Sequence, residues 1–440
     1  MSKPDFTIER LGEMRIPSPV KLSTVTGDYV ANYVEDDERV LYEIDVKADQ
    51  RSAAFDGSEL MEKAGPRPKI YFDPARTHAG IVTCGGLCPG INDVIRAIVM
   101  CLAYDYGVTK ITGFRFGYRG LLSELAQEPM TLAPHVVKDI HKFGGTILGS
   151  SRGYGERTAE MVDTLVARGV DILFAIGGDG TQRGAMDICR HIRQRGLNIS
   201  VIGVPKTIDN DLSYVQQSFG FQTSVCKAVD AVRAAHTEAV DAINGVGLVK
   251  VMGRQSGYIA AETTMAASDV NFVLVPEVPF ELEGDNGFLA HMERRLERRQ
   301  HAVVLVAEGA GQDLLTKTNR TDASGNIVLS DIGLFLKMHL TEHFRKRGIE
   351  INLKYIDPSY IIRGAPANAF DSVYCQRLGT NAVHAAMAGK TAMVISMMHN
   401  HLVHVPMALT VGRRNCIDPD GALWRDVLDA TGQPKLMVNG

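Results

Sequence analysis

Residues 199–211 read ISVIGVPKTIDND and join an apolar run to a cluster of charged residues. The apolar part has the length and composition of a buried strand in a parallel sheet, and a lysine, a hydroxyl, an amide and two carboxylates follow it. Open α/β sheets bind their ligands beyond the carboxyl ends of their strands. This stretch therefore predicts an α/β fold in which residues 205–211 handle a charged ligand.

The same order of strand, glycine-rich turn and helix recurs along the chain, which predicts parallel sheets. The loop 84–90 (CGGLCPG) separates a strand from an amphipathic helix over 91–99, and a longer helix is expected from 219 to about 243. Further strands are predicted at 79–83, 171–176, 247–251, 272–277 and 301–309. With 440 residues, the chain exceeds one hydrophobic core and should form two lobes.

The composition excludes several classes of function. A net charge of -4 argues against a general nucleic-acid binder, which needs an excess of cations against phosphates. Seven cysteines without a CxxC pair are typical of reduced thiols. No apolar run approaches the about 20 residues that span a bilayer, and the first residues lack the apolar core of a signal peptide. We therefore expect a soluble cytoplasmic protein without membrane or nucleic-acid partners.

Two further glycine-rich turns have the residues of phosphate sites. Residues 144–153 read GGTILGSSRG and residues 177–181 read GGDGT. Glycines let backbone N–H groups approach an anion at a helix N-terminus, and a carboxylate there suits Mg²⁺ held near phosphates. Arg152 also reads as a solvated surface charge, and Asp179 as a simple helix cap. His399 and His401, expected on one side of a strand, are interpreted as structural rather than metal-binding residues.

The motifs taken together, in their order, resemble the 6-phosphofructokinases from Ala79 to about His404. The loop GGLCPGIND (85–93), KYIDPSYIIR (354–363) and the N-terminal extension resemble the ATP-using branch related to pyrophosphate-dependent enzymes, found in plants, trypanosomatids and some bacteria. The motifs that carry the resemblance are GGLCPGIND (85–93), GGTILGSSRG (144–153), GGDGT (177–181), PKTIDND (205–211), MGR (252–254), Glu308 and YIIR (360–363).

The resemblance implies ATP-dependent phosphorylation of D-fructose 6-phosphate at its 1-hydroxyl, giving fructose 1,6-bisphosphate and ADP in glycolysis, with Mg²⁺ as cofactor. Asp209 would accept the proton, with Thr207 and Arg254 beside it, Asp179 would hold Mg²⁺, and Asp211 would contribute on the metal side. The implied nucleotide-binding residues are Gly86, Arg152, Gly153, Gly178, Asp179, Gly180 and Thr181. The implied sugar-phosphate-binding residues are Thr207, Ile208, Asp209, Met252, Gly253, Arg254, Glu308, Lys354, Tyr360, Ile361, Ile362 and Arg363.

The resemblance also implies two Rossmann-like three-layer lobes with mostly parallel sheets, and a homodimer or homotetramer of an allosteric enzyme. The expected parts are an N-terminal extension over 1–75, a nucleotide-binding lobe of 76–220 and 362–410, and a sugar-phosphate-binding lobe of 221–361 and 411–440. Glu277 lies where some relatives place an effector-linked acid, and it also reads as a plain carboxylate at a strand end.

At three positions, the residue of this chain bears either on how the chain departs from the family pattern or on which phosphoryl donor it uses. Short bacterial enzymes supply an arginine from a neighbouring subunit where this chain has Gly245. Pyrophosphate users typically carry a second aspartate where this chain has Gly180, and that carboxylate would repel the α-phosphate of ATP. Lys206 instead resembles the pyrophosphate-dependent relatives. We favour ATP as the donor, with a pyrophosphate-dependent enzyme as one alternative and a non-catalytic regulatory subunit as another.

Overall fold

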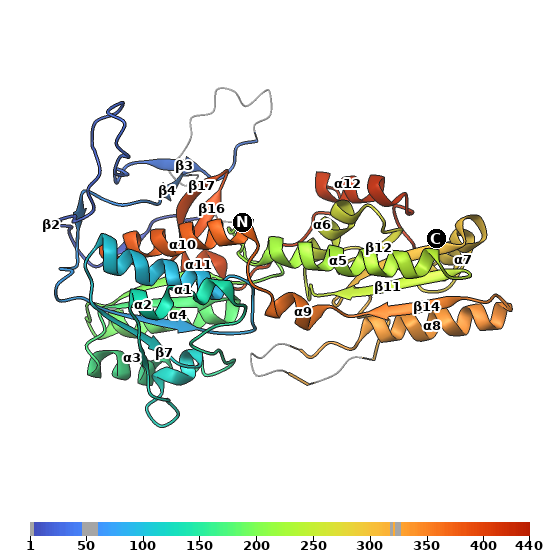
Figure 1. Cartoon of the computed structure of the whole chain (residues 1–440), viewed down its shortest axis with the longest axis horizontal. Coiled ribbons are helices and arrows are strands. Elements are labelled where there is room, and N and C mark those ends of the chain that lie inside the picture. The colour runs from blue at the N-terminus through green and yellow to red at the C-terminus, as the bar shows by residue number, and fades with distance from the viewer. Residues whose placement is uncertain (1–3, 46–59, 317–319, 322–326) are drawn as a thin grey trace. The chain divides into compact units, whose positions relative to one another are not determined.

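The computed structural model describes residues 4–45, 60–316, 320–321 and 327–440. The chain forms two compact units, coloured by residue number in Figure 1. Unit 1 contains residues 1–207, 212–219 and 366–413, and unit 2 contains residues 208–211, 220–365 and 414–440. The chain therefore passes from one unit to the other several times: one passage falls within the PKTIDND motif, after Thr207, and another follows its last residue, Asp211.

Unit 1 is built on a nine-stranded sheet in the order β3-β4-β17-β16-β10-β9-β6-β7-β8. The five strands from β16 to β7 are parallel, and the outer strands pair antiparallel. The strands are β3 (Arg39–Leu41), β4 (Leu60–Lys63), β6 (His78–Thr83), β7 (Lys110–Phe114), β8 (Met130–Thr131), β9 (Ile172–Gly177), β10 (Ser200–Pro205), β16 (Met393–Met398) and β17 (His401–Pro406). Because β6, β9 and β10 are buried along their whole length, their runs of apolar residues lack the alternation of a half-exposed strand.

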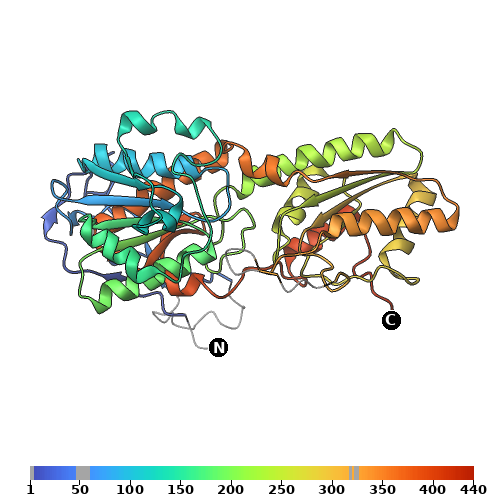
Figure 2. The same cartoon turned by 90° about the horizontal axis from the view of Figure 1, so that it is seen from below.

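Helices cover the two faces of this sheet, as Figure 2 shows for unit 1. Helices α3 and α4 pack together over one face, and α1 packs against α10. The helices are α1 (Ile91–Met100), α2 (Pro134–Val137), α3 (Thr158–Ala167), α4 (Asp179–Gln194), α10 (Ala369–Met387) and α11 (Met407–Thr410), with short helical turns η3 (Cys101–Asp105), η4 (Gly117–Leu121) and η5 (Ile140–Lys142). The carboxyl ends of β6 and β9 lead directly into glycine-rich turns.

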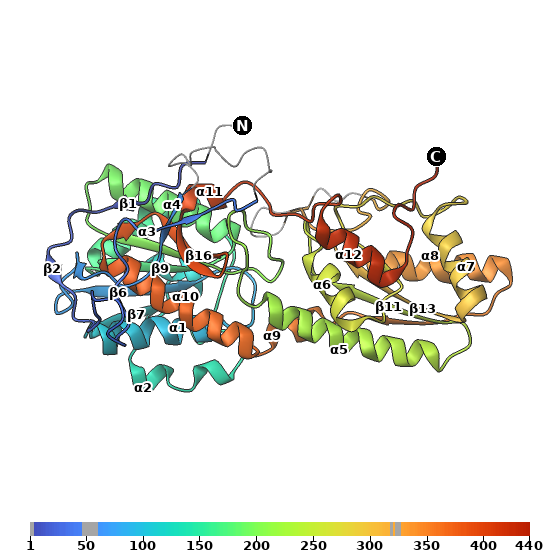
Figure 3. The same ribbon diagram turned by 90° about the horizontal axis from the view of Figure 1, so that it is seen from above.

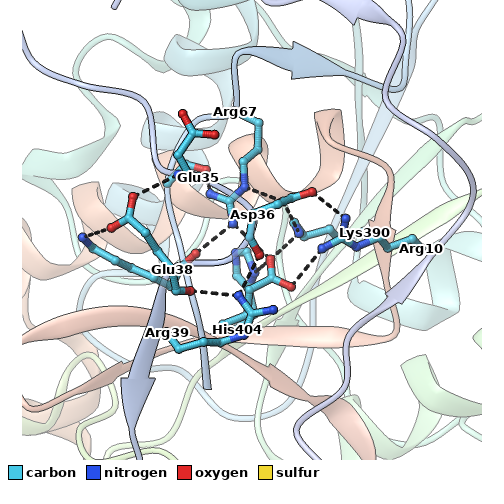
Figure 4. A network of polar contacts seen from close by, with 11 residues as sticks. Arg10, Glu35, Asp36, Glu38, Arg39, Arg67, Lys390 and His404 are labelled. Atoms are coloured by element: carbon cyan, nitrogen blue, oxygen red, sulfur yellow. Dashed lines mark hydrogen bonds and ion pairs between the residues drawn. The ribbon is translucent and has the colours of Figure 1, made fainter. Parts of the chain in front are cut away.

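A buried network of charges joins the N-terminal residues to this sheet (Figure 4). The carboxylate of Glu62 on β4 accepts hydrogen bonds from Arg67 at 3.0 Å, from His404 Nδ1 on β17 at 3.0 Å, and from Lys390. Arg67 also binds Asp36 at 2.9 Å. The side chains of Arg67 and Lys390 are each 1% exposed, so the centre of the network is buried, whereas Asp36 at its edge is partly exposed.

Smaller strand pairs complete the N-terminal part. Strand β1 (Glu9–Arg10) pairs with β15 (Lys390–Thr391), and β2 (Ile16–Pro17) pairs with β5 (Lys69–Ile70), both antiparallel. Together with β3 and β4, these strands tie the described residues of the extension to unit 1 at several points.

Unit 2 contains a smaller sheet in the order β12-β13-β11-β14, with all strands parallel. The strands are β11 (Gly245–Val251), β12 (Phe272–Leu274), β13 (His301–Ala307) and β14 (Asn352–Ile356). The helices are α5 (Phe221–Val240), α6 (Tyr258–Ala267), α7 (Phe288–Arg299), α8 (Ile332–Arg347), α9 (Ser359–Gly364) and α12 (Ala422–Thr431). Helix α5 packs along β11, β13 and β14, and α6 packs between α5 and α12 (Figure 3).

The expected fold class is confirmed, since both units contain largely parallel sheets covered by helices. Some element ends differ from the prediction: α4 begins at Asp179 rather than near residue 182, and β12 ends at Leu274 rather than at 277. Within the described parts of the chain, no helix is both long enough and apolar enough to cross a membrane.

The expectation that His399 shares a strand face with His401 is wrong. His399 and Asn400 form the two-residue turn between β16 and β17, with φ angles of 48° and 65°. Two consecutive residues with positive φ are typical of the tight turns that match the twist of a hairpin. The ring of His399 bonds the carbonyl oxygen of Tyr42 at 2.9 Å, so the histidine has a structural contact in the turn.

Candidate active site

In unit 1, the carboxylate of Asp179 lies at the N-terminus of α4, directly after β9 and Gly178. Its side chain is 11% exposed, and its oxygens accept hydrogen bonds from Arg183 at 2.8 Å and from the backbone N–H of Gly412 at 3.3 Å. The next residue, Gly180, has no atom within 4 Å of the position that a Cβ would take. The carboxylate therefore stands beside open space at a helix N-terminus, a place that favours anions.

The glycine-rich loops of unit 1 meet around Lys206. The ammonium of Lys206 donates to the carbonyl oxygen of Gly86 at 2.8 Å, and the Ser150 hydroxyl donates to that of Gly85 at 2.7 Å. Gly85 has a φ of +88°, which favours glycine over any residue with a side chain. These contacts bring a buried cation and the backbone of two loops together, which is an arrangement suited to phosphate.

The remaining nucleotide-side residues lie on the same loops. Arg152 is exposed, and Gly153 takes a φ of +87°. Thr181 is buried in the first turn of α4, where its carbonyl oxygen accepts a hydrogen bond from Tyr118 at 2.5 Å. The structure thus places the predicted nucleotide-side residues at the carboxyl edge of one sheet.

In unit 2, Asp209 lies in an environment that disfavours its charge. Burial, together with the neighbouring charges of Asp211 and Glu308, raises the pKa of this carboxyl to about 8, against the opposing effect of Arg414 and Arg254. A carboxyl with a raised pKa holds a proton more tightly and is a stronger base once ionised. This residue therefore has the electrostatic character of a general base.

Asp211 is held by a residue that sequence reasoning missed. The guanidinium of Arg414 lies 2.5 Å from the Asp211 carboxylate, and the backbone N–H of Asn415 donates to the Asp211 carbonyl oxygen at 2.9 Å. The pairing spans 203 residues of sequence, and the local signal was only the basic pair Arg413-Arg414 after a glycine. The C-terminal residues thus contact the proposed catalytic motif directly.

Two of the predicted sugar-phosphate residues of unit 2, Arg254 and Glu308, follow the carboxyl ends of β11 and β13. The backbone N–H of Glu308 donates to Val251 at 2.9 Å, and that of Gly309 donates to Gly253 at 3.0 Å, so the ends of the two strands are joined. Burial raises the pKa of Glu308, and the nearby charges of Arg254 and Arg363 oppose this rise. One carboxyl and two guanidinium groups therefore share one neighbourhood.

Other predicted sugar-side residues differ in their exposure. Tyr360 on α9 is 85% exposed and Ile361 is also exposed, whereas Ile362 and Ile208 are buried. Lys354 lies level with Gly247, four residues before β11 ends, and its ammonium is 3.9 Å from Glu238 on α5. The structure thus brings Arg254, Glu308 and Arg363 together and gives Lys354 a separate contact.

Gly245 opens β11, and its position leaves no room for a side chain. A Cβ there would lie 2.0 Å from the carbonyl oxygen of Ala239. The backbone around this position is therefore built for glycine.

A Mg²⁺ ion fits the residues of unit 1. In the described part of the chain, no group of three or more histidines, cysteines or acidic residues could hold a metal by itself. Mg²⁺ commonly takes one or two protein carboxylates and completes its shell with water and substrate phosphates. The carboxylate of Asp179, next to the open position at Gly180, meets that requirement.

Comparisons with known proteins identify the family of this chain. A family model described as Phosphofructokinase matches residues 78–386. The chain is 52% identical to "ATP-dependent 6-phosphofructokinase" of Borreliella burgdorferi, covering 99% of this chain and 98% of the relative. It is 48% identical to the protein of the same name from Trypanosoma cruzi, covering 84% of this chain and 76% of the relative.

The fold also matches solved structures. The crystal structure of pyrophosphate-dependent phosphofructokinase from Marinobacter aquaeolei aligns with a TM-score of 0.65 and 21% identity, covering 81% of this chain and 91% of that one. This match supports the architecture, and the family model and the more similar relatives extend the likeness to the sequence itself. The chain belongs to the phosphofructokinase family.

Proposed function

We propose that this protein transfers the γ-phosphoryl group of ATP to the 1-hydroxyl of D-fructose 6-phosphate, giving fructose 1,6-bisphosphate and ADP. The observation that carries the proposal is the Asp209 carboxyl, whose pKa is raised by burial and by neighbouring acids while Arg254 lies close enough to oppose the rise. The relatives of this chain that are about half identical to it carry the name of an ATP-dependent enzyme.

In the proposed mechanism, ionised Asp209 accepts the proton of the sugar's 1-hydroxyl as that oxygen attacks the γ-phosphorus. Phosphoryl transfer depends mainly on positioning and charge stabilisation, so a well-placed base and nearby cations are the chief requirements. Thr207 precedes the base by two residues and is proposed to contact the sugar, while Arg254 stabilises the negative charge of the transferred group. Arg414 limits the rise in the pKa of Asp209 and so favours its ionised form.

The nucleotide side is proposed to use the loops of unit 1. Asp179 would hold Mg²⁺, which neutralises phosphate charge when bound. The backbone of Gly86, Gly153 and Gly178 would approach the phosphates. Lys206 lies three residues before Asp209, so at most about 11 Å of chain separates the two residues. One short segment therefore carries both a cation and the base.

The sugar phosphate is proposed to bind Arg254, Arg363 and Tyr360, with Glu308 accepting hydrogen bonds from sugar hydroxyls. Charge-assisted bonds from guanidinium groups are well suited to a phosphate dianion. The shared neighbourhood of Glu308, Arg254 and Arg363 supports this assignment.

The proposed donor is ATP because position 180 is open. An aspartate there would place a like charge near the α-phosphate at a cost of about 4 kcal/mol for a separation of about 4 Å. Lys206 is the observation that favours pyrophosphate instead. Its ammonium, however, donates to the carbonyl oxygen of Gly86, in the loop that is proposed to bind the phosphates. From that position it can neutralise the terminal phosphate of either donor.

The test is a comparison of both donors on the purified chain with fructose 6-phosphate and Mg²⁺. We expect turnover with ATP, measured as ADP and fructose 1,6-bisphosphate. Turnover with pyrophosphate but not with ATP would overturn the donor assignment. A purified chain that is folded and inactive with both donors would favour the non-catalytic alternative.

We further propose that the enzyme works in the cytoplasm as a homodimer or homotetramer. The seven cysteines are present as thiols rather than as disulfides, which supports a reducing compartment. Gly245 leaves no side chain for the contact that short bacterial enzymes make between subunits, so any such contact must use another residue. Light scattering of the purified protein measures the oligomer directly.

A further inference from the structure

Lys250 is a charged residue in a strand that is otherwise buried. It is the sixth of the seven residues of β11, and the other six are buried. Its side chain is 12% exposed, and its ammonium lies 2.8 Å from a carboxylate oxygen of Asp331 and 2.9 Å from one of Asp357. A lysine shielded in this way needs both partners, because a buried charge without compensation is costly.

Each of the two carboxylates also stabilises the start of a helix. The second oxygen of Asp331 accepts the backbone N–H of Leu334 at 3.0 Å, which caps α8. The second oxygen of Asp357 accepts the backbone N–H and the hydroxyl of Ser359, at 3.1 and 2.5 Å, where α9 begins. One ammonium therefore joins the N-terminal ends of two helices to the carboxyl end of β11.

Both elements joined in this way lead to residues of the proposed sugar-phosphate site. Strand β11 continues after Val251 into the MGR motif, which ends at Arg254, and α9 carries Tyr360 and Arg363. The charges of Lys250, Arg254 and Arg363 all act on the carboxyl of Glu308. The ion-paired lysine thus belongs to the same electrostatic neighbourhood as the proposed sugar ligands.

We propose that Lys250 is a positioning residue for the sugar phosphate, which fixes α9 against the end of β11 through Asp357 and joins the start of α8 to the same point through Asp331. This inference rests on the proposed function. The lysine acts in two ways: it sets the place of Arg363 relative to Arg254, and it offsets two carboxylates that would otherwise repel a phosphate dianion. It makes no contact with the reacting atoms.

The first test is the variant Lys250→Met, which keeps the length of the aliphatic stem and removes the charge. We expect the KM for fructose 6-phosphate to rise by about 10-fold or more, while the KM for ATP and kcat change by less than about 3-fold, because the affected interactions are ground-state contacts to the sugar. An unchanged KM for the sugar, or equal losses for both substrates, would overturn the proposal.

Two further variants separate positioning from a general loss of structure. Lys250→Arg supplies a guanidinium that can bind both carboxylates, so it should restore most of the affinity for the sugar. Asp357→Asn leaves the pair of Lys250 with Asp331 intact and detaches α9, so it should raise the KM for the sugar even if Lys250→Met fails to fold. A normal KM for the sugar in folded Asp357→Asn would contradict the role of the bridge.

The matched control is Lys227→Met on α5. Lys227 is also an ion-paired lysine of unit 2, bound to Asp230 at 3.1 Å, and its side chain is exposed. Its loss should leave both KM values unchanged. If the native protein does not turn over ATP and fructose 6-phosphate, the proposed function fails; if it does and Lys250→Met behaves like Lys227→Met, only this inference fails.

Discussion

The guanidinium of Arg414 lies 2.5 Å from the carboxylate of Asp211, two residues along the chain from Asp209. Asp211 raises the pKa of the Asp209 carboxyl and Arg414 lowers it, so the ion pair partly cancels its own effect on the proposed base. A residue near the C-terminus of the chain thereby influences the ionisation of a residue in the middle of the chain.

The variant Arg414→Met should shift the pH dependence of the reaction. Without the cation, Asp211 acts on Asp209 unopposed, and the pKa of Asp209 rises further. Since the base must be ionised, the acidic limb of the profile of kcat/KM against pH should move to higher pH by roughly one unit, with turnover at pH 7 reduced accordingly. The neighbouring exposed residue offers the control, because Arg413→Met should leave the limb in place. A shift in the opposite direction would remove Arg414 from this role.

The variant Asp209→Ser should lower kcat by at least about 10²-fold, the lower end of what a positioned general base supplies. The KM for fructose 6-phosphate should change little, because the lost interaction belongs to the transition state. In the native enzyme, the pKa of about 8 predicts that kcat/KM falls as the pH drops below that value, since Asp209 then becomes protonated. Steady-state kinetics from pH 6 to 9 measure both effects, and an unchanged kcat in the variant would show that another group accepts the proton.

The variant Gly180→Asp should lose the use of ATP. Its side chain would enter open space without a steric clash, so the expected loss is electrostatic, up to about 10³-fold in kcat/KM for ATP at a cost of about 4 kcal/mol. Gly180→Ala is the matched control, because it adds the Cβ without the charge and should leave the use of ATP nearly intact. Equal losses in the two variants would show that space rather than charge decides the donor.

The variant Glu62→Gln should destabilise unit 1. Burial alone would raise the pKa of Glu62, but the hydrogen bonds and charges of His404 and Lys390 hold it well below its usual range. Removing the carboxylate charge leaves buried cations without their partner, at a cost of about 3 kcal/mol or more, which should lower the Tm by several degrees. Glu38→Gln removes the 2.6 Å ion pair with Lys63, whose side chain is about one third exposed. The loss of this pair should lower the free energy of unfolding by less than about 1 kcal/mol. If both variants have the native Tm, the network does not stabilise the fold.

The parallel sheets and the glycine-rich turns could be predicted from the sequence, because both depend on local signals. A run such as residues 199–204 predicts a buried strand, and GGDGT predicts a turn before a helix. The hairpin at His399 was missed because its turn lacks the usual Asn-Gly pair. The contacts of Arg414 with Asp211 and of Lys250 with Asp331 and Asp357 were not predicted, because they join residues from 81 to 203 positions apart and no local pattern encodes such pairs.

The Glu62 network also has a consequence for synthesis of the chain. Glu62 finds its partners Lys390 and His404 only 328 and 342 residues later, and β4 gains its neighbour β17 equally late. A ribosome adds about 5 to 20 residues each second. The edge of the unit 1 sheet therefore stays incomplete for about tens of seconds, during which all of residues 220–365 are synthesised. During that interval, β4 and its carboxylate lack these partners, and this edge of the nascent chain is open to aggregation and to chaperones.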